Sequence, residues 1–359
     1  MKEVINIIFA ETHRNLGIPD YFFENYFNKK QIRYAPKARY AIVNILKDVP
    51  NLKCVALPSY MCGIVPKIIK SNLKNCKILY YKNNLSDLNP SLYSFKKLVK
   101  SVDIDAVIVP SLYGQAADLM GFEKFCKEEN IFMIDDAAQS FGSKLLNRNV
   151  GAYGNSGLIS FGPSKPLPAH MGSFYWSDLD NNTQTIQDIN FIDNNLRKLS
   201  FVLFYFQRVK SVNNHLRKIL SYLSAIIDLY PFHANGYRGW ESLFYGEIIR
   251  NKLVESGKIK IELIKQIESL PKFKNIIVHT DLKKINNLQK FVFSCDNQTK
   301  NTILSLLSEH KIPYLSGYNL LNFAKDDPLI KRNIFEIPIY SNKIYSNKFI
   351  DFIEETNEI

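Results

Sequence analysis

Cysteine is scarce in this chain, which has five in 359 residues. They are odd in number and scattered, and no CxxC pair occurs among Cys54, Cys62, Cys76, Cys126 and Cys295. This spacing argues against a zinc site or a dithiol redox motif, and no metal site is expected. Such cysteine usage is typical of a reducing compartment.

Long apolar runs are also lacking, because no stretch reaches the roughly 20 residues that a membrane-spanning helix needs. Residues 1–17 carry Glu3, Glu11 and His13, and they lack a cationic start followed by a clean apolar core. A secretory signal peptide is therefore not expected. We predict a cytoplasmic protein.

Acidic residues are outnumbered, with 34 Asp and Glu against 46 Lys and Arg and a formal net charge of +12. Two explanations stay open: the composition bias of an AT-rich genome, and an anionic partner such as a phosphorylated ligand. No RNP, helix-turn-helix or zinc-finger pattern occurs, so nucleic-acid binding is not expected. The 46% apolar and 22% charged residues are ordinary for a soluble globular protein.

Apolar runs alternate with helical patterns through the first half of the chain. Strands are predicted over 54–60, 77–82, 105–114, 131–136 and 156–162, and helices over 65–73, 91–101 and 121–130. This alternation predicts an α/β fold with a mostly parallel sheet covered by helices on both faces. In such sheets the chemistry lies beyond the carboxyl ends of the strands, so those ends are expected to meet at one edge.

The pattern changes after the last of these strands, and three regions are predicted. Residues 1–180 form the large domain, 181–234 a basic and apolar helical segment, and 235–359 a smaller α+β domain. The part at 195–232 either packs against the domains or a second subunit, or makes a weak membrane-surface contact. No internal repeat is found.

A single lysine, Lys165, stands between two prolines in the stretch LISFGPSKPLPAHMG. Burial lowers the pKa of a lysine because desolvation disfavours the charged form. A neutral amine is a nucleophile that forms Schiff bases with aldehydes, including pyridoxal 5′-phosphate (PLP). PLP also needs an acid for its ring nitrogen and polar groups for its phosphate. Asp136 and Ser160 are the candidates for these two roles.

Two carboxylates, Asp135 and Asp136, end the buried strand at 131–136. One of them should point inward, because side chains alternate along a strand. In a different interpretation, a carboxylate of this pair is the N-cap of a helix that begins with the sequence AAQS.

The run MIDDAAQSFGSKLLNRNVGAYGNSGLISFGPSK resembles the DegT-like, PLP-dependent nucleotide-sugar aminotransferases of fold type I. The stretches VPSLYGQAADL, VALPSYMC and FEIPIYSNKIYSNKFIDFI also resemble segments of that family. The resemblance implies that Lys165 links to the cofactor and moves a proton, and that Asp136 pairs with the pyridine nitrogen. It places Gln139 near the cofactor ring oxygen and Ser160 at the phosphate.

Several positions depart from the family's pattern. Its phosphate loop aligns with KARYAIVNIL, where Arg39 and Tyr40 stand in place of small and hydroxyl residues. The ring-stacking aromatic falls on Cys62, with Tyr60 two residues earlier. The residue that reaches the neighbouring subunit's cofactor matches Arg238. The resemblance implies a homodimer whose sites lie at the interface.

The expected function is transfer of an amino group, from glutamate, to a nucleotide-linked keto-sugar in surface-polysaccharide (O-antigen) or deoxysugar biosynthesis. Two alternatives stay open. A PLP sugar dehydratase would have histidine in place of Lys165, although His170 lies nearby. A catalytically lost pseudoenzyme would serve as a binding or assembly subunit.

Overall fold

The structure, a computed structural model, describes most of the large domain and parts of the C-terminal region. The described residues are 20–29, 31–35, 37–162, 165–166, 172–179, 276–279, 290–312, 314–321 and 327–338, with single positions 219, 223, 348, 351, 352 and 355. The segment 181–234, apart from 219 and 223, and the residues His170 and Arg238 lie outside them. The predictions made for that segment and those residues stay predictions.

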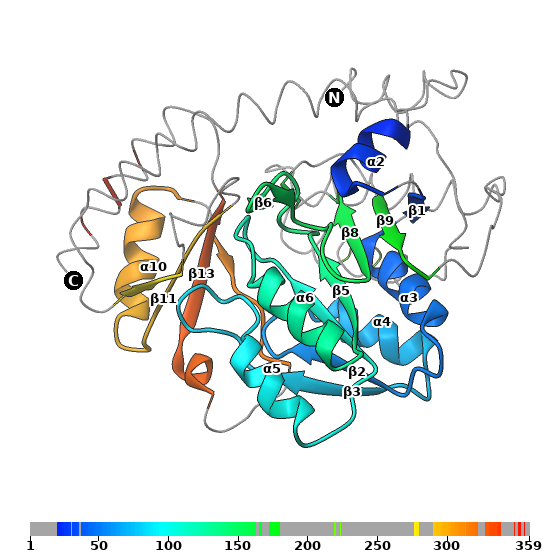
Figure 1. Ribbon diagram of the computed structural model, residues 1–359. Helices are drawn as coiled ribbons and strands as arrows, with labels where there is room; N and C mark the ends of the chain where they lie inside the picture. Colours follow the sequence, from blue (N-terminus) through cyan, green and yellow to red (C-terminus); the bar gives the residue numbers. More distant parts are fainter. Residues whose placement is uncertain are drawn as a thin grey trace.

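A seven-stranded sheet forms the centre of the large domain (Figure 1). Its order is β1 (Arg33–Ala35), β9 (Ser173–Ser177), β8 (Ser156–Ser160), β5 (Phe132–Asp136), β4 (Ala106–Pro110), β2 (Cys54–Pro58) and β3 (Lys77–Tyr81). The strands from β3 to β8 are parallel, whereas β9 and β1 are antiparallel to their neighbours. The predicted mostly parallel sheet is confirmed.

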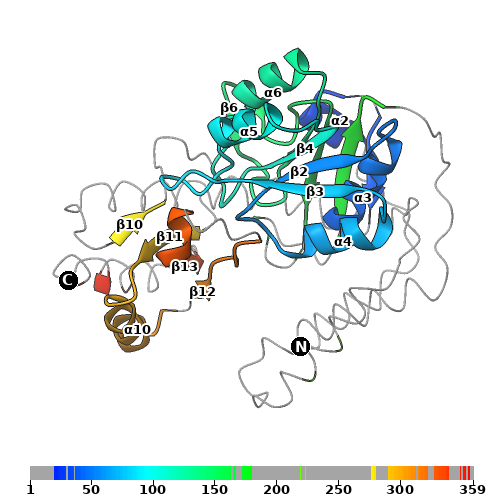
Figure 2. The same ribbon diagram turned by 90° about the horizontal axis from the view of Figure 1, so that it is seen from below.

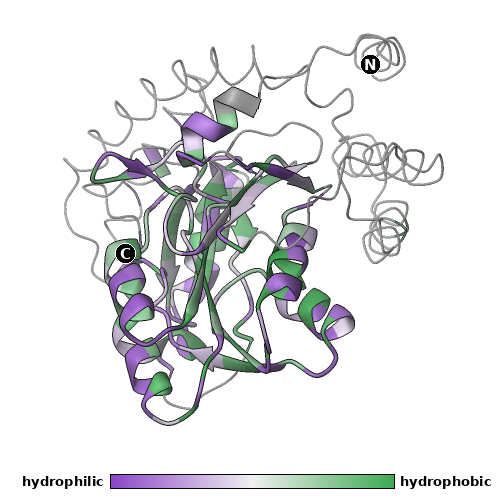
Figure 3. Cartoon of the chain, turned by 45° about the vertical axis from the view of Figure 1, so that its right-hand side comes forward, coloured by the Kyte–Doolittle hydropathy of each residue, from purple (hydrophilic) through white to green (hydrophobic). Residues whose placement is uncertain are grey.

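Helices cover both faces of this sheet (Figure 2). On one face lie α2 (Asp20–Phe27), α5 (Leu92–Val99) and α6 (Leu119–Glu128), and on the other α3 (Ala38–Asp48) and α4 (Ile64–Asn72). Each face has its own apolar cluster, because alternate strand residues point to opposite sides. Figure 3 shows apolar strands inside and polar outer helix surfaces.

The described C-terminal region contains a smaller antiparallel sheet. Its order is β10 (Ile276–Val278), β11 (Lys290–Cys295), β13 (Asn333–Pro338) and β12 (Leu315–Ser316). Helix α10 (Lys300–Glu309) follows β11 and buries Ile303 and Leu307. The α+β character agrees with the predicted fold class. The boundaries at 180 and 234 fall on residues that the structure does not describe.

His279 connects this smaller sheet to two loops of the large domain through hydrogen bonds. Its Nδ1 lies 2.6 Å from the carbonyl oxygen of Leu85, and its Nε2 lies 2.7 Å from the hydroxyl of Ser294. Its own carbonyl accepts a hydrogen bond of 2.9 Å from Gln115. Burial lowers the pKa of His279 to about 4. A neutral ring fits these contacts, with Nδ1 donating to the carbonyl and Nε2 accepting from Ser294.

Among the described residues, no helix is long and apolar enough to cross a membrane.

Candidate active site

The carboxyl ends of β2, β4 and β5 meet at one edge of the large sheet, as predicted. The hydroxyls of Tyr60, after β2, and Tyr113, after β4, lie 2.7 Å apart. The Tyr113 backbone N–H points at Gln139 Oε1, which follows β5, at 3.5 Å. The amide of Gln139 in turn donates to the hydroxyl of Tyr318 at 2.6 Å. Tyr318 follows β12 of the smaller sheet, so this edge lies where the C-terminal region meets the large sheet.

Asp135 and Asp136 are both buried but point to opposite faces of β5. Asp135 Oδ2 accepts hydrogen bonds from the backbone N–H of Gly151 (2.6 Å) and of Tyr153 (3.1 Å). Its Oδ1 is buried without a hydrogen-bond partner. Burial raises the pKa of Asp135 to about 8. The two backbone N–H donors and the charge of Arg148 lower this pKa, and through those two bonds Asp135 organises the turn.

Asp136 faces the lysine instead. Its Oδ1 accepts from the backbone N–H of Ala138 at 2.9 Å, and in the described part of the chain its Oδ2 has no partner. Residues 138–142 form turns and no helix follows Asp136, so the interpretation of Asp136 as a helix N-cap is wrong. Burial raises the pKa of Asp136, while the Ala138 N–H and the charge of Lys165 lower it. The unbonded oxygen leaves room for one cationic N–H donor.

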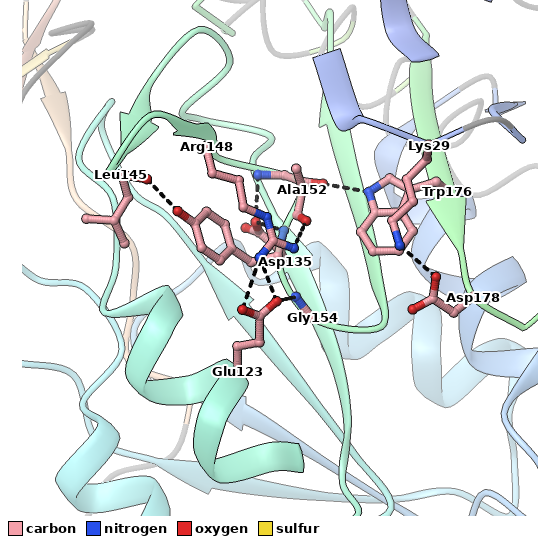
Figure 4. Close-up of polar contacts among 11 residues, drawn as sticks. Lys29, Glu123, Asp135, Leu145, Arg148, Ala152, Gly154, Trp176 and Asp178 are labelled. Atoms are coloured by element: carbon pink, nitrogen blue, oxygen red, sulfur yellow. Dashed lines mark hydrogen bonds and ion pairs between the residues drawn. The ribbon is translucent and has the colours of Figure 1, made fainter. Parts of the chain in front are cut away.

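The turn that Asp135 organises is held from outside by Arg148, in the short strand β7 (Arg148–Asn149), which pairs with β6 (Lys144–Leu145) (Figure 4). The guanidinium binds both carboxylate oxygens of Glu123 at 2.9 and 3.0 Å and also donates to the carbonyl of Ala152. Glu123 accepts from the Gly154 N–H at 2.8 Å. This half of the family motif is therefore structural, and it supports β5 from the face opposite Asp136.

Lys165 is half-buried and begins no regular element. Its backbone N–H closes a turn onto the carbonyl of Gly162 at 3.0 Å. Burial lowers the pKa of Lys165, the nearby charges of Lys290 and Arg39 lower it further, and Cys62 and Asp136 raise it. Four residues therefore act electrostatically on the amine, and the sequence analysis named three of them as site candidates: Cys62, Asp136 and Arg39.

Ser160 ends β8 five residues before the lysine, and it is 4% exposed. A Cβ on Gly162 would lie 3.5 Å from Lys165 Cγ and 3.8 Å from Ser160 Oγ, so the hydroxyl and the lysine stem flank the same glycine. Within the described residues the Ser160 hydroxyl has no hydrogen-bond partner. It is a buried donor available to an anion.

The predicted phosphate loop forms the first turn of α3. Lys37 is the N-cap residue and makes no side-chain cap hydrogen bond, and Arg39 lies in the first turn. A helix N-terminus attracts anions through its backbone N–H groups and dipole. Tyr40 is buried in the apolar cluster on the α3 face, so its ring packs in the core.

Tyr60 and Cys62, the two candidates for covering a cofactor ring, differ in environment. Tyr60 is fully buried, with its ring centroid 5.6 Å from that of Tyr318. Cys62 is half-buried and acts electrostatically on both Lys165 and Tyr318. Which of the two covers the ring stays a prediction.

Sequence reasoning missed Tyr113, Tyr318, Lys290 and Glu336, which gather at the same edge. Tyr113 had a signal, since it lies in the stretch VPSLYGQAADL and precedes a glycine. Glu336 also lies in a quoted stretch, FEIPIYSNKIYSNKFIDFI, although no role was assigned to it. No motif marked Lys290 and Tyr318.

The comparisons with known proteins agree with this geometry. Residues 79–183 match the sequence model of the DegT/DnrJ/EryC1/StrS aminotransferase family. The family resemblance is confirmed. A GDP-perosamine synthase of Vibrio cholerae is 29% identical over 75 residues, which are 21% of this chain and 20% of that protein. A UDP-4-amino-4,6-dideoxy-N-acetyl-beta-L-altrosamine transaminase of Campylobacter jejuni is 31% identical over 97 residues, 27% of this chain and 25% of that protein.

The fold is shared over a much longer stretch than the sequence similarity. A DegT DnrJ EryC1 StrS aminotransferase from Brucella abortus superposes with a TM-score of 0.68 and 16% identity, over 99% of this chain and 94% of that one. The large domain therefore has the fold type I architecture. The chain spans about a fifth to a quarter of the length of the two curated relatives above.

Proposed function

We propose that this protein is a PLP-dependent aminotransferase acting on a nucleotide-linked keto-sugar. The observation that carries the proposal is one lysine, Lys165, whose pKa is lowered by burial beside a carboxylate, Asp136, with an unbonded oxygen. The matched family and the named activities of the curated relatives support the same reaction class.

The residues present fit PLP. When bound, PLP supplies an aldehyde and an electron-accepting ring. Lys165 is the amine for the aldehyde, and Asp136 is the partner for a protonated ring nitrogen. Ser160, Arg39 and the N-terminus of α3 are the groups for the phosphate, because an anion there gains a buried hydroxyl, a guanidinium and helix N–H groups.

Each residue then has a task that its surroundings explain. Lys165 holds or releases a proton at Nζ, and its lowered pKa makes the neutral amine available nearer to neutral pH. Asp136 stabilises positive charge on the ring nitrogen, and that charge in turn favours the carboxylate over the acid. Gln139 donates to the Tyr318 hydroxyl, which would hold its amide for the ring oxygen.

The overall reaction exchanges an amino group for an oxygen. An amino acid, glutamate by resemblance, loses its amino group with uptake of one water and leaves as the keto acid. The keto-sugar takes the amino group at its carbonyl carbon and releases one water. The proposed setting is surface-polysaccharide biosynthesis, such as O-antigen, or deoxysugar biosynthesis, in the cytoplasm. The proposed assembly is a homodimer.

Two other functions are less well supported. The lysine at position 165 is the group a transaminase needs, where a sugar dehydratase of this family would have histidine. A pseudoenzyme would not need an amine of lowered pKa facing an unbonded carboxylate oxygen. The colour of the purified protein distinguishes the enzyme from the pseudoenzyme. The enzyme with bound PLP should be yellow, and a pseudoenzyme should be colourless.

The decisive experiment is reductive trapping. The purified chain is incubated with PLP, reduced with borohydride, digested and mapped by mass spectrometry. We expect the pyridoxyl mass on the peptide containing Lys165, and no trapping in Lys165→Ala. A label on another lysine, with Lys165 unmodified, rules out the assignment.

A further inference from the structure

A chain of buried polar groups connects the small domain to the proposed active site. It begins at Lys290 on β11 and Glu336 on β13, which are 9% and 3% exposed. The Lys290 amine donates to Glu336 Oε2 at 2.5 Å. The other carboxylate oxygen, Oε1, accepts from the Tyr113 hydroxyl at 2.6 Å. The buried ion pair is thus bonded directly to the large domain.

The hydrogen bonds beyond Glu336 have a single direction. A carboxylate only accepts hydrogen bonds, so Tyr113 donates its one hydroxyl hydrogen to Glu336. Tyr60 must then donate to Tyr113, at 2.7 Å. With its hydrogen used, the Tyr60 oxygen accepts from the backbone N–H of Tyr318 at 3.2 Å. The charge of Glu336 therefore sets the donor and acceptor roles of the Tyr113 and Tyr60 hydroxyls, and leaves the Tyr60 oxygen to accept from Tyr318.

The chain ends on a residue assigned to the cofactor. The hydroxyl of Tyr318 accepts from Gln139 at 2.6 Å. Gln139, Tyr60 and Tyr113 belong to the large domain, and the other three members to the small domain. The position of the small domain is therefore transmitted to the Gln139 amide through hydrogen bonds.

Gly317 is shaped for this contact. A Cβ at this position would lie 2.5 Å from the Tyr60 hydroxyl and 2.7 Å from Ile334 Cβ, closer than real Cβ atoms approach. The glycine lets the Tyr318 N–H reach Tyr60. Its own N–H donates to the Ile334 carbonyl at 2.9 Å, which fixes the segment on β13.

A buried ion pair is a costly way to join two domains, because both charges lose their hydration and apolar residues of the same size often serve as well. Here the ion pair fixes the direction of the hydrogen bonds and the positions of the residues that they join. We propose that Lys290 and Glu336 are positioning residues of the proposed active site, which fix Tyr318 against Gln139 through Tyr113 and Tyr60. This inference rests on the proposed function and adds residues that touch no reacting atom.

The test uses the full chain and PLP, followed by the absorbance of the bound cofactor. Glu336→Gln keeps the shape but removes the charge and offers N–H groups to Tyr113, so the order of donors is reversed. We expect PLP to bind about tenfold more weakly, with a shifted absorption maximum, since each 1.4 kcal/mol corresponds to a factor of ten. Lys290→Met should weaken binding similarly, and Lys290→Arg should restore it.

A matched control loosens the other contact between the two regions. Ser294→Ala removes the hydroxyl that holds the ring of His279, whose Nδ1 bonds the Leu85 carbonyl. We expect it to lower the melting temperature while the dissociation constant and spectrum of PLP stay at wild-type values. A loss of PLP affinity in Ser294→Ala equal to that in Glu336→Gln would show that general loosening of the domains is the cause and would overturn the proposal.

A double-mutant cycle tests the path itself. In a Tyr318→Phe background, Glu336→Gln should weaken PLP binding much less than in the wild type, because the link through the Tyr318 hydroxyl is removed and only the long contact of the Tyr113 N–H with Gln139 Oε1, at 3.5 Å, remains. If the affinity losses of the two single variants multiply in the double variant, the proposal is overturned. If a single variant fails to fold, the neutral double variant Lys290→Met/Glu336→Gln is tested in its place. Binding of PLP by this double variant with wild-type affinity also overturns the proposal. A wild-type chain that binds no PLP refutes the proposed function as well.

Discussion

At the scale of single residues, two neighbouring aspartates have different roles because a strand alternates its side chains. Asp135 receives two backbone N–H groups and supports a turn, and Asp136 faces Lys165. The same carboxyl group is thus structural at position 135 and, in the proposed function, chemical at position 136. Sequence spacing to Gln139 favoured Asp136 as the cofactor's partner, and this choice stays a prediction.

We predict that Asp136→Ala abolishes transamination and weakens PLP binding, because the ring nitrogen loses the anion that keeps it protonated. Asp135→Ala should instead lower stability by about 1–3 kcal/mol, since it leaves buried N–H groups unpaired, while the surviving folded protein keeps PLP. Steady-state rates, PLP titration and thermal melts of both variants check this. An active Asp136→Ala with a dead, folded Asp135→Ala would show the roles to be exchanged.

At the scale of elements, glycine at one strand position permits a turn to pack on the sheet. Gly157, in β8, faces the Gly151 carbonyl, where a Cβ would lie 1.8 Å from the oxygen. The same carbonyl accepts from the Trp176 indole at 2.8 Å (Figure 4). Strand β8, which carries Ser160, is therefore held closely against the turn that Asp135 organises.

We predict that Gly157→Ala destabilises the fold by about 1–3 kcal/mol or more, because the strand or the turn must shift to relieve the overlap. Gly63→Ala is the matched control, since a Cβ there meets only Leu321 Cδ2, at 3.6 Å, and its backbone is helical. Urea denaturation measures both. Equal midpoints for the two variants would contradict the packing described here.

The elements themselves were predictable because they depend on local patterns. The buried run at β5 ending in two carboxylates, and the Gly–Pro–Ser sequence before Lys165, indicated both the sheet and the site. The contacts of Glu336 were not predictable, since its partner Tyr113 is 223 residues away in the chain. No periodicity indicates which buried carboxylate meets which hydroxyl, and only the packing of the two domains decides it.

At the scale of the whole molecule, the site is built from segments of both domains. Strand ends of the large sheet supply Asp136 and Ser160, and the C-terminal region supplies Tyr318 and Lys290, whose charge lowers the pKa of Lys165. The protein groups that would bind the phosphate are less complete in this chain than in the family's usual loop. Arg39 and Tyr40 replace small and hydroxyl residues, and Tyr40 packs in the core. A phosphate there benefits from a further cation.

We predict that Arg238 of a second subunit supplies that cation, since a guanidinium suits a cluster of anionic oxygens and an unpaired, partly buried phosphate is costly. Lys165→Ala and Arg238→Ala homodimers should each be inactive or nearly so. Mixing them should restore activity, because one site of each mixed dimer then has both groups. Sedimentation at the assay concentration gives the assembly state. An active monomer, or mixed dimers as inactive as their parents, would place Arg238 outside the site or within its own subunit.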